Sequence, residues 1–107
     1  MPNTHEMIFK TLADPTRRAI YERLCRDGEL TVGALTAQAR VSQPAVSKHL
    51  GLLKRAGLVL DRPEGRQTHY TAQLGALTPL VDWTSQMAGF WESRFDSLED
   101  LLKRMDR

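Results

Sequence analysis

The segment from Ser42 to Gly57 constrains the fold most, because both ends of a helix and its buried face are visible in it. Ser42 is a favourable helix N-cap, and Pro44 falls in the first turn, where its missing amide proton costs nothing. Gly57 stands where a helix commonly ends in a left-handed residue. Three apolar residues spaced by four and three form one stripe: Val46, Leu50 and Leu53. This pattern predicts a helix that buries one face, with small polar side chains outward in its first half and cations in its second.

Shorter helical segments precede this one. Apolar residues within 7–12 predict a first helix. Asp14 followed by Pro15 predicts the start of a second helix, since aspartate is a good N-cap and proline suits the first helical position. That helix is expected to end at residues 27–28 (DG), and a third to run over residues 31–39.

A hairpin is predicted after the capped helix. Residues 58–61 and 67–72 have the composition of short strands, and residues 62–66 (RPEGR) between them have the composition of a turn. Two strands alone are marginally stable in water, so this hairpin must pack against the helices.

The C-terminal part, residues 77–105, has a helical apolar pattern of unusual length. A helix of this length spans about 40 Å, whereas a domain of ~100 residues has a radius of gyration near 13 Å. The helix would therefore extend beyond a lone domain, and its apolar face needs a second surface. We expect that surface to be the same helix of another copy. The residues expected in the dimer interface are Phe9, Leu80, Trp83, Met87, Trp91, Leu98 and Leu101.

These segments predict a mainly α fold of the α+β kind: a five-helix winged helix-turn-helix with a two-stranded β-hairpin wing and a long C-terminal dimerisation helix. A single domain is expected over residues 1–107. Its expected parts are an N-terminal helix at 1–12, a helical core at 15–57 with the helix-turn-helix at 31–56, the wing at 58–72 and the dimerisation helix at 77–105.

Composition excludes most other classes of protein. The 107 residues, 41% apolar and 26% charged, suffice for one core and have the balance of a soluble globule. No stretch approaches the roughly 20 apolar residues that a membrane span needs, and no signal peptide is visible. Cys25 is the only cysteine, so no internal disulfide can form. We therefore expect a cytoplasmic protein that has no membrane partner and no cofactor.

Positive charge is concentrated in the middle of the chain. Residues 40–66 contain six Lys or Arg and two Asp or Glu, a net +4, although the whole chain is only +2. A local basic patch favours a polyanion partner, and an α-helix with short side chains at its start fits the major groove of DNA. We therefore expect double-stranded DNA as the partner. The residues expected to contact it are Ser42, Gln43, Pro44, Ala45, Ser47, Lys48, His49, Lys54, Arg55, Arg62, Arg66 and Gln67.

Three segments resemble the ArsR family of bacterial winged-helix repressors. They are residues 12–24 (LADPTRRAIYERL), 41–59 (VSQPAVSKHLGLLKRAGLV) and 62–70 (RPEGRQTHY), and the middle one is highly specific. The resemblance implies a homodimer, paired through the first and last helices, that binds an imperfect palindrome and represses transcription. In this family, ligand binding usually releases the DNA.

The chain departs from the family where its sensing members bind an effector. Metalloid-sensing members have ELCVCDL at the start of the third helix, whereas residues 29–35 here are ELTVGAL, with Thr31 and Gly33 in place of the cysteines. A soft ion requires thiolates, which neither residue supplies. Other members bind zinc through Asp and His of the last helix, but residues 77–107 contain no His. We therefore expect no metal site.

Two local features and two alternative functions stay open. Arg40 stands where helix-turn-helix turns often have a left-handed glycine, so either the turn differs or Arg40 is strained; we favour a different turn. Cys25 is expected to be half-buried and structural. One alternative is a small-molecule- or thiol-responsive sensor whose unknown effector binds at the dimer seam; another is a protein-interaction module. No nucleophile–base pair or nucleotide loop supports an enzyme.

Overall fold

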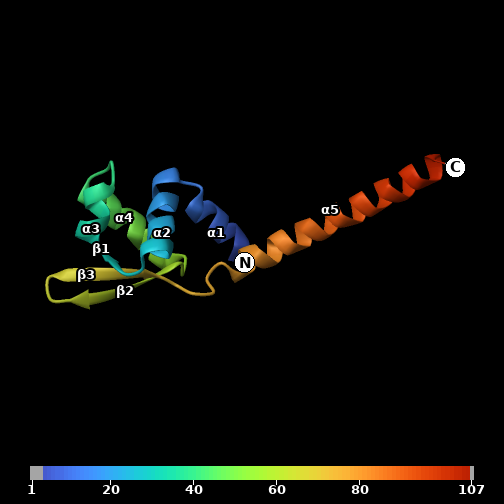
Figure 1. Cartoon of the computed structure of the whole chain (residues 1–107). Helices are drawn as coiled ribbons and strands as arrows, with labels where there is room; N and C mark the ends of the chain where they lie inside the picture. The colour runs from blue at the N-terminus through green and yellow to red at the C-terminus, as the bar shows by residue number, and fades with distance from the viewer. Residues whose placement is uncertain (1–3, 107) are drawn as a thin grey trace. The chain divides into compact units, whose positions relative to one another are not determined.

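The computed structural model describes residues 4–106, so the first three residues of the predicted 1–12 helix lie outside the described residues. Over this range it contains five helices and three short strands, which confirms the predicted fold class (Figure 1). The elements are α1 (Thr4–Leu12), α2 (Pro15–Asp27), β1 (Leu30–Thr31), α3 (Val32–Gln38), α4 (Gln43–Arg55), β2 (Val59–Glu64), β3 (Gln67–Ala72) and α5 (Thr78–Met105).

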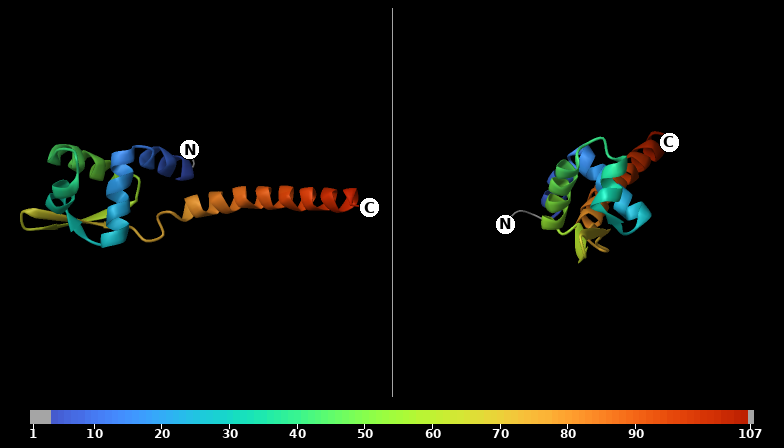
Figure 2. Two further views of the ribbon diagram at one scale, coloured as in Figure 1. Left: turned by 45° about the horizontal axis from the view of Figure 1, so that its top comes forward. Right: turned by 90° about the vertical axis from the view of Figure 1, so that its left-hand side faces the viewer.

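The chain divides into two compact units, Met1–Leu77 and Thr78–Arg107. The first unit contains α1 to α4 and the small sheet, and the second consists of α5. Within the first unit, the hairpin of β2 and β3 lies along one side of the helices and its turn projects past α3 (Figures 1 and 2).

One hydrophobic core holds the first unit together. The helix α4 packs against both α2 and α3, and its predicted stripe of Val46, Leu50 and Leu53 is confirmed, with each side chain fully buried. Full burial of a leucine contributes about 2 kcal/mol to folding, so this stripe fixes which face of α4 is left outward. The other core residues are Ile8, Ile20, Tyr21, Leu24, Leu35, Leu58 and Val59.

Side-chain caps define the starts of α2 and α3. The carboxylate of Asp14 accepts a hydrogen bond from the Arg17 backbone amide at 2.9 Å and begins α2. The hydroxyl of Thr31 accepts from the Ala34 amide at 3.1 Å and begins α3. Each cap satisfies an amide that has no partner within the helix, which is why these elements begin where the sequence predicts.

The sheet has one more strand than predicted. Its order is β1-β3-β2, because Leu30 and Thr31 pair antiparallel with Tyr70 and His69 of β3. A strand of two residues is too short to show an alternating pattern, so it could not be recognised from the sequence. Its consequence for the site is that residue 29 lies next to the wing.

The predicted wing turn over residues 62–66 was too long. The strand β2 continues to Glu64, and the turn consists of Gly65 and Arg66, with Gly65 at φ 60°. Pro63 lies inside β2, where a proline is tolerated because β2 is the edge strand of the sheet. Arg62 is therefore paired in register with His69 rather than placed in a loop.

The turn between α3 and α4 does not contain the left-handed residue of the common helix-turn-helix turn, as predicted. α3 ends at Gln38, and the next residue, Ala39, is extended at φ −82° and ψ 150°. No described residue other than glycine has a positive φ. Arg40 is thus unstrained.

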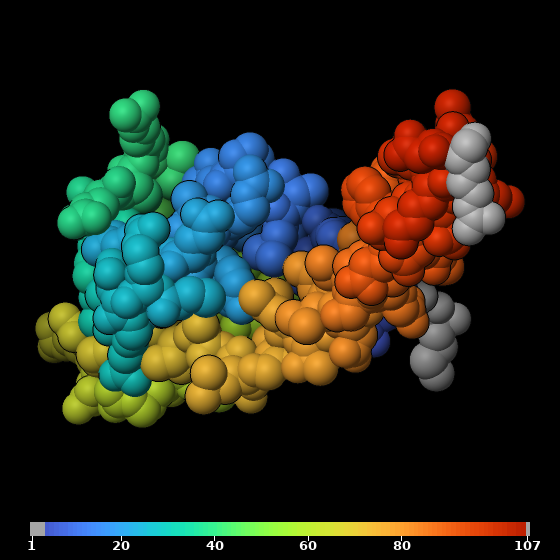
Figure 3. Space-filling model, turned by 45° about the vertical axis from the view of Figure 1, so that its right-hand side comes forward, coloured from blue at the N-terminus to red at the C-terminus, as the bar shows by residue number. Residues whose placement is uncertain are grey.

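The helix α5 is 28 residues long, about 42 Å at 1.5 Å per residue. None of its residues is buried, and its aromatic residues include Phe90, Trp91 and Phe95, each at least 60% exposed. Figure 3 shows one face of this helix in orange to red. Among the described residues, no helix is long and apolar enough to cross a membrane.

Candidate nucleic-acid interface

The outward face of α4 presents most of the side chains predicted to contact DNA. Because Val46, Leu50 and Leu53 are buried, the opposite side of α4 faces solvent. The hydroxyl of Ser42 accepts a hydrogen bond from the Ala45 amide at 3.4 Å and so caps the first turn of the helix. Small and polar side chains occupy this first turn, which allows a close approach of a duplex. The predicted residues of this segment that are exposed are Ser42, Gln43, Pro44, Ser47, Lys48, Lys54 and Arg55, and Ala45 is half-buried.

His49 is not fully directed outward. It is half-buried, and its Nδ1 lies 3.4 Å from Nη1 of Arg17 in α2. The Nε of the same arginine donates a hydrogen bond to the Thr11 carbonyl. His49 also lowers the pKa of Asp14, although the larger cause of that lowering is the hydrogen bond from the Arg17 amide. Arg17 thus connects α4 to the first turn of α2 through a contact that the sequence did not predict.

Lys54, which is predicted to contact a DNA phosphate, forms an ion pair in the chain without DNA. Its Nζ lies 3.0 Å from Oδ2 of Asp61, which joins the end of α4 to β2. Both groups are partly exposed, so the pair contributes little to stability and can be exchanged for a phosphate. Arg55, the next residue, forms no ion pair with another described residue.

The half of the hairpin nearer its turn contains, together with Glu29, a cluster of two carboxylates, one guanidinium and one imidazole, which we call the wing cluster: Glu29, Arg62, Glu64 and His69. Nη2 and Nε of Arg62 face the Glu29 carboxylate at 2.5 and 3.5 Å, and Nη1 lies 3.0 Å from Oε2 of Glu64. The two nitrogens of His69 lie 3.4 Å from Glu29 and 3.2 Å from Glu64. Every nitrogen of the Arg62 guanidinium therefore has a carboxylate partner within the chain.

Contacts within the wing cluster shift the pKa values of Glu29 and Arg62. The hydrogen bond from Arg62 is the main cause that lowers the pKa of the Glu29 carboxyl. The same bond, followed by the one to Glu64, raises the pKa of Arg62. Glu29 was not identified from the sequence, because 33 residues separate it from Arg62 and only the pairing of β1 with β3 brings them together.

Two residues that were predicted to contact DNA are exposed at the tip of the wing. Arg66 in the two-residue turn and Gln67 at the start of β3 are exposed, and neither forms an ion pair or a side-chain hydrogen bond with another described residue. The tip is therefore the part of the wing whose polar groups are available to a partner.

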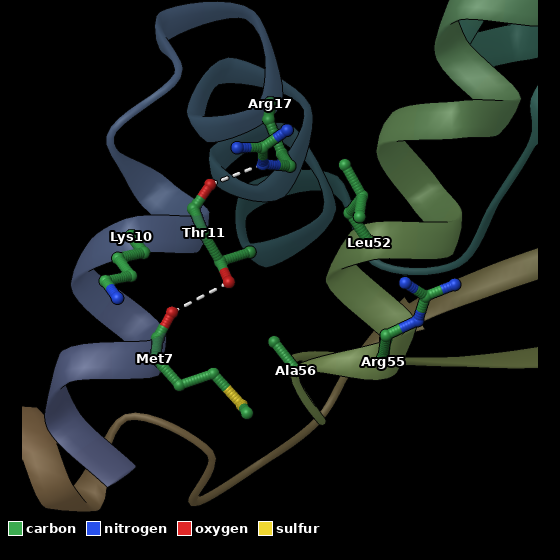
Figure 4. Close-up of a pocket in the computed structure, with 7 residues that line it drawn as sticks. All are labelled: Met7, Lys10, Thr11, Arg17, Leu52, Arg55 and Ala56. Carbon is green, nitrogen blue, oxygen red and sulfur yellow. Dashed lines mark hydrogen bonds between the residues drawn. The ribbon is translucent and has the colours of Figure 1, made fainter. Parts of the chain in front are cut away.

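A hollow of about 240 Å³ lies beside the C-terminal end of α4, between that helix and α1. Its walls include the apolar side chains of Met7 and Leu52, and Lys10 and Arg55 stand on opposite sides of it (Figure 4). Arg17 lies above it and is bonded to the Thr11 carbonyl (Figure 4).

Cys25 differs from the prediction of a half-buried residue. It is exposed, because the core-facing side of α2 is occupied by Ile20, Tyr21 and Leu24. Burial, followed by a hydrogen bond with Cys25, raises the pKa of Tyr21 to about 12. Over residues 4–106, no three His, Cys, Asp or Glu side chains are grouped so that they could hold a metal ion.

A capped recognition helix (α4), a short turn before it and a hairpin with two arginines after it define a winged helix-turn-helix DNA-binding protein. A family model described as a helix-turn-helix domain matches residues 12–62. The arsenical resistance operon repressor of Escherichia coli K12 is 48% identical over 102 residues, which cover 94% of this chain and 83% of the repressor. The HTH-type transcriptional regulator Rv2034 of Mycobacterium tuberculosis is 47% identical over 87 residues, which cover 77% of this chain and 80% of that regulator.

Solved structures give the same result. The crystal structure of an ArsR family transcriptional regulator, RHA00566, matches with a TM-score of 0.78 at 32% identity, covering 87% of this chain and 95% of the other. The chain belongs to the ArsR family of winged helix-turn-helix transcriptional regulators. It is a DNA-binding regulator of transcription and not an enzyme.

Proposed function

We propose that this chain is a repressor that binds an imperfect palindromic operator as a homodimer and does so without sensing a metal ion. The observation that supports this most directly is the exposed polar and cationic face of α4, held outward by a fully buried stripe on the opposite side. In a dimer, the two copies of α4 would lie about 34 Å apart, one turn of B-DNA, and would enter successive major grooves. A repressor acts on the chromosome, so the proposal includes a cytoplasmic location in a bacterial cell.

The residues predicted to contact DNA differ in whether they already have an interaction partner in the chain without DNA. Gln43, Ala45, Ser47 and Lys48 read bases or the adjacent backbone from the first half of α4, while Ser42 and Pro44 shape its start. Arg55, Arg66 and Gln67 contact phosphates or the minor groove without first breaking an ion pair. Lys54, Arg62 and His49 reach the DNA only after exchanging Asp61, the wing cluster or Arg17 for a phosphate.

The dimer is proposed to form through the apolar side of α5, with α1 contributing Phe9. No residue of α5 is buried in the single chain. Large apolar side chains that are exposed along a helix of this length mark an association surface. We also propose that residues 1–107 act as one functional domain. The residues proposed for the interface are Phe9, Leu80, Trp83, Met87, Trp91, Leu98 and Leu101.

Metal-independent regulation rests on the ligand set. The resistance operon repressor named above is an arsenical regulator by name, but this chain has Thr31 and Gly33 at the positions of the family's thiolate motif. Thr31 is moreover occupied as the N-cap of α3. Arsenite added at micromolar concentration is therefore expected to leave DNA binding unchanged.

Fluorescence anisotropy over a salt series tests the proposal. One duplex contains the region upstream of the chain's own gene, and the other is a scrambled control. Affinity at least 10³-fold higher for the upstream duplex, with a steep salt slope, is expected of a specific repressor that regulates its own gene. Gln43→Ala should lower affinity about 10-fold on the specific duplex alone, whereas Lys48→Ala should weaken both duplexes and reduce the salt slope by about one. Lys103→Ala on α5 is the matched control. Absence of binding to either duplex at low salt would contradict DNA binding.

A further inference from the structure

A second hollow, of about 390 Å³, lies between α2 and the C-terminal end of α3. Its apolar lining includes Ala19, Ile20 and Leu35, and three arginines also line it: Arg23, Arg26 and Arg40. None of the lining residues is acidic. A hollow of this volume, partly apolar and with a few convergent polar groups, has the size and composition of a site for a small molecule.

The three arginines leave donors available. Nη1 of Arg23 donates to the Ala34 carbonyl of α3 at 3.0 Å, and its Nε is buried and donates no hydrogen bond, although Oδ2 of Asp27 lies 3.5 Å away. Arg26 and Arg40 form no ion pair or side-chain hydrogen bond with another residue of the described range 4–106. Guanidinium groups bind carboxylate and phosphate groups in a bidentate manner, so these positions favour an anion.

The hollow between α1 and α4 is a useful contrast. It also has three cations, but it is smaller, and its Arg17 is already bonded to Thr11 and close to His49. The α2–α3 hollow combines a larger volume with two arginines that have no ion-pair or side-chain hydrogen-bond partner among the described residues.

We propose that the α2–α3 hollow binds a small organic anion: a carboxylate or phosphate group held by Arg26 and Arg40, attached to a compact apolar body that packs on Ala19, Ile20 and Leu35. The chemistry of the lining identifies this class of ligand. The site lies wholly within one chain and one unit, so it is separate from the α5 stripe.

Occupation of this site would affect the recognition helix. Leu35 is fully buried and belongs to α3, which packs directly on α4 and leads into it through residues 39–42. A ligand that bridges α2 and α3 fixes their separation and so biases the position of α4. This consequence rests on the proposed function, whereas binding of the ligand does not.

Titration calorimetry on the full chain without DNA tests the site, with benzoate as the probe and benzamide as its uncharged analogue. Benzoate is expected to bind in the millimolar range, as suits a ligand with few atoms, and benzamide at least 10-fold more weakly. Arg26→Gln and Arg40→Gln should each weaken benzoate binding about 10-fold. Ala19→Leu fills the hollow without changing the charge and should abolish binding, whereas Lys10→Gln at the other hollow is the charge-matched control.

Two outcomes would overturn the site. Benzoate that binds Ala19→Leu as well as the wild type, or that is weakened equally by Lys10→Gln, would show diffuse attraction to a basic surface. Failure of both benzoate and phenyl phosphate to bind at 10 mM, a concentration on the order of the dissociation constant expected for such small ligands, would exclude small anions.

DNA phosphate is the other source of the same chemistry, and the anisotropy assay separates the two. If the site belongs to a free anion, saturating benzoate changes the operator affinity of the wild type at least 3-fold and leaves that of Ala19→Leu unchanged. If Arg26→Gln instead reduces operator affinity and the salt slope while benzoate does not bind, a backbone phosphate occupies the hollow and the proposal is wrong. Should no duplex bind at all, the proposed function fails, but the calorimetry still decides the site.

Discussion

Arg62 is exposed on β2, yet each of its guanidinium nitrogens faces a carboxylate of Glu29 or Glu64. An arginine in this state must exchange two carboxylates for a phosphate before it can contribute to DNA binding. Arg66, four residues further along, has no such partner over residues 4–106. Two arginines of the same hairpin therefore differ in their availability, although their sequence surroundings look alike.

Glu29→Gln tests whether the wing cluster restrains Arg62. The Glu29 carboxylate contacts two nitrogens of the Arg62 guanidinium, so its removal should free the guanidinium to contact the DNA backbone. We expect operator affinity to rise about 3- to 10-fold at low salt and the salt slope to steepen by about one. Anisotropy over a salt series measures both quantities.

Glu22→Gln is the control for that experiment, because it changes the net charge equally at an exposed position of α2. A gain of the same size in Glu22→Gln would mean that net charge alone is responsible. A loss of affinity in Glu29→Gln would show the opposite role, in which Glu29 holds Arg62 in the conformation that contacts DNA.

At the scale of the elements, local chemistry determined where most helices begin and end. Asp14, Thr31 and Ser42 each accept a hydrogen bond from an amide of the first turn, and Gly57 follows α4 at φ 77°. These features involve residues no more than a few positions apart, so they can be predicted from the sequence. The strand β1 could not be predicted, because its two residues are strand only through their pairing with Tyr70 and His69.

The cap of α2 predicts a pH dependence of stability. The Arg17 amide is the main cause that lowers the pKa of Asp14 below its ordinary value of 3.8. Because the ionised form is favoured in the folded state, its contribution to stability is complete above that ordinary value and is lost as the pH falls through the lower, folded-state pKa. Asp14→Asn keeps a capping oxygen that does not ionise. Its Tm should lie below that of the wild type at neutral pH and approach it as the pH falls below 3.8 and through the lowered, folded-state pKa of Asp14.

Asp14→Ala removes the cap as well as the charge. Its Tm should be lower by about 5 °C at neutral pH, a larger decrease than that of Asp14→Asn. Thermal unfolding followed by circular dichroism measures both variants. A Tm difference between wild type and Asp14→Asn that stays constant down to about pH 2.5 would contradict a role for ionisation.

At the scale of the whole molecule, the main feature is that α5 leaves large apolar side chains exposed to solvent. Trp91 contacts Phe95 at a ring-centroid distance of 6.3 Å, and the Arg94 guanidinium lies 5.8 Å from the centroid of Trp91, yet the tryptophan is 60% exposed. Local contacts on one helix cannot remove a large aromatic stripe from water. The proposed association with a second copy would remove it.

Trp91→Glu should therefore dissociate the dimer. A carboxylate in an apolar seam has no partner, so we expect the dimer dissociation constant to increase at least 100-fold. Analytical ultracentrifugation measures it, and Ser93→Glu, which adds the same charge away from the stripe, should leave it unchanged. An unchanged dissociation constant in Trp91→Glu would place the interface elsewhere.

The sequence by itself determined the caps, the buried stripe of α4, the hairpin and the family, because each depends on residues close together in the chain or on a contiguous motif. Only the tertiary structure decided which cations are available. It paired Lys54 with Asp61 and Arg62 with Glu29 and brought Arg17 next to His49. It also placed Arg23, Arg26 and Arg40 around one hollow. Most of these contacts join residues far apart in the sequence, so they exist only once β1 has paired with β3 and the helices have packed.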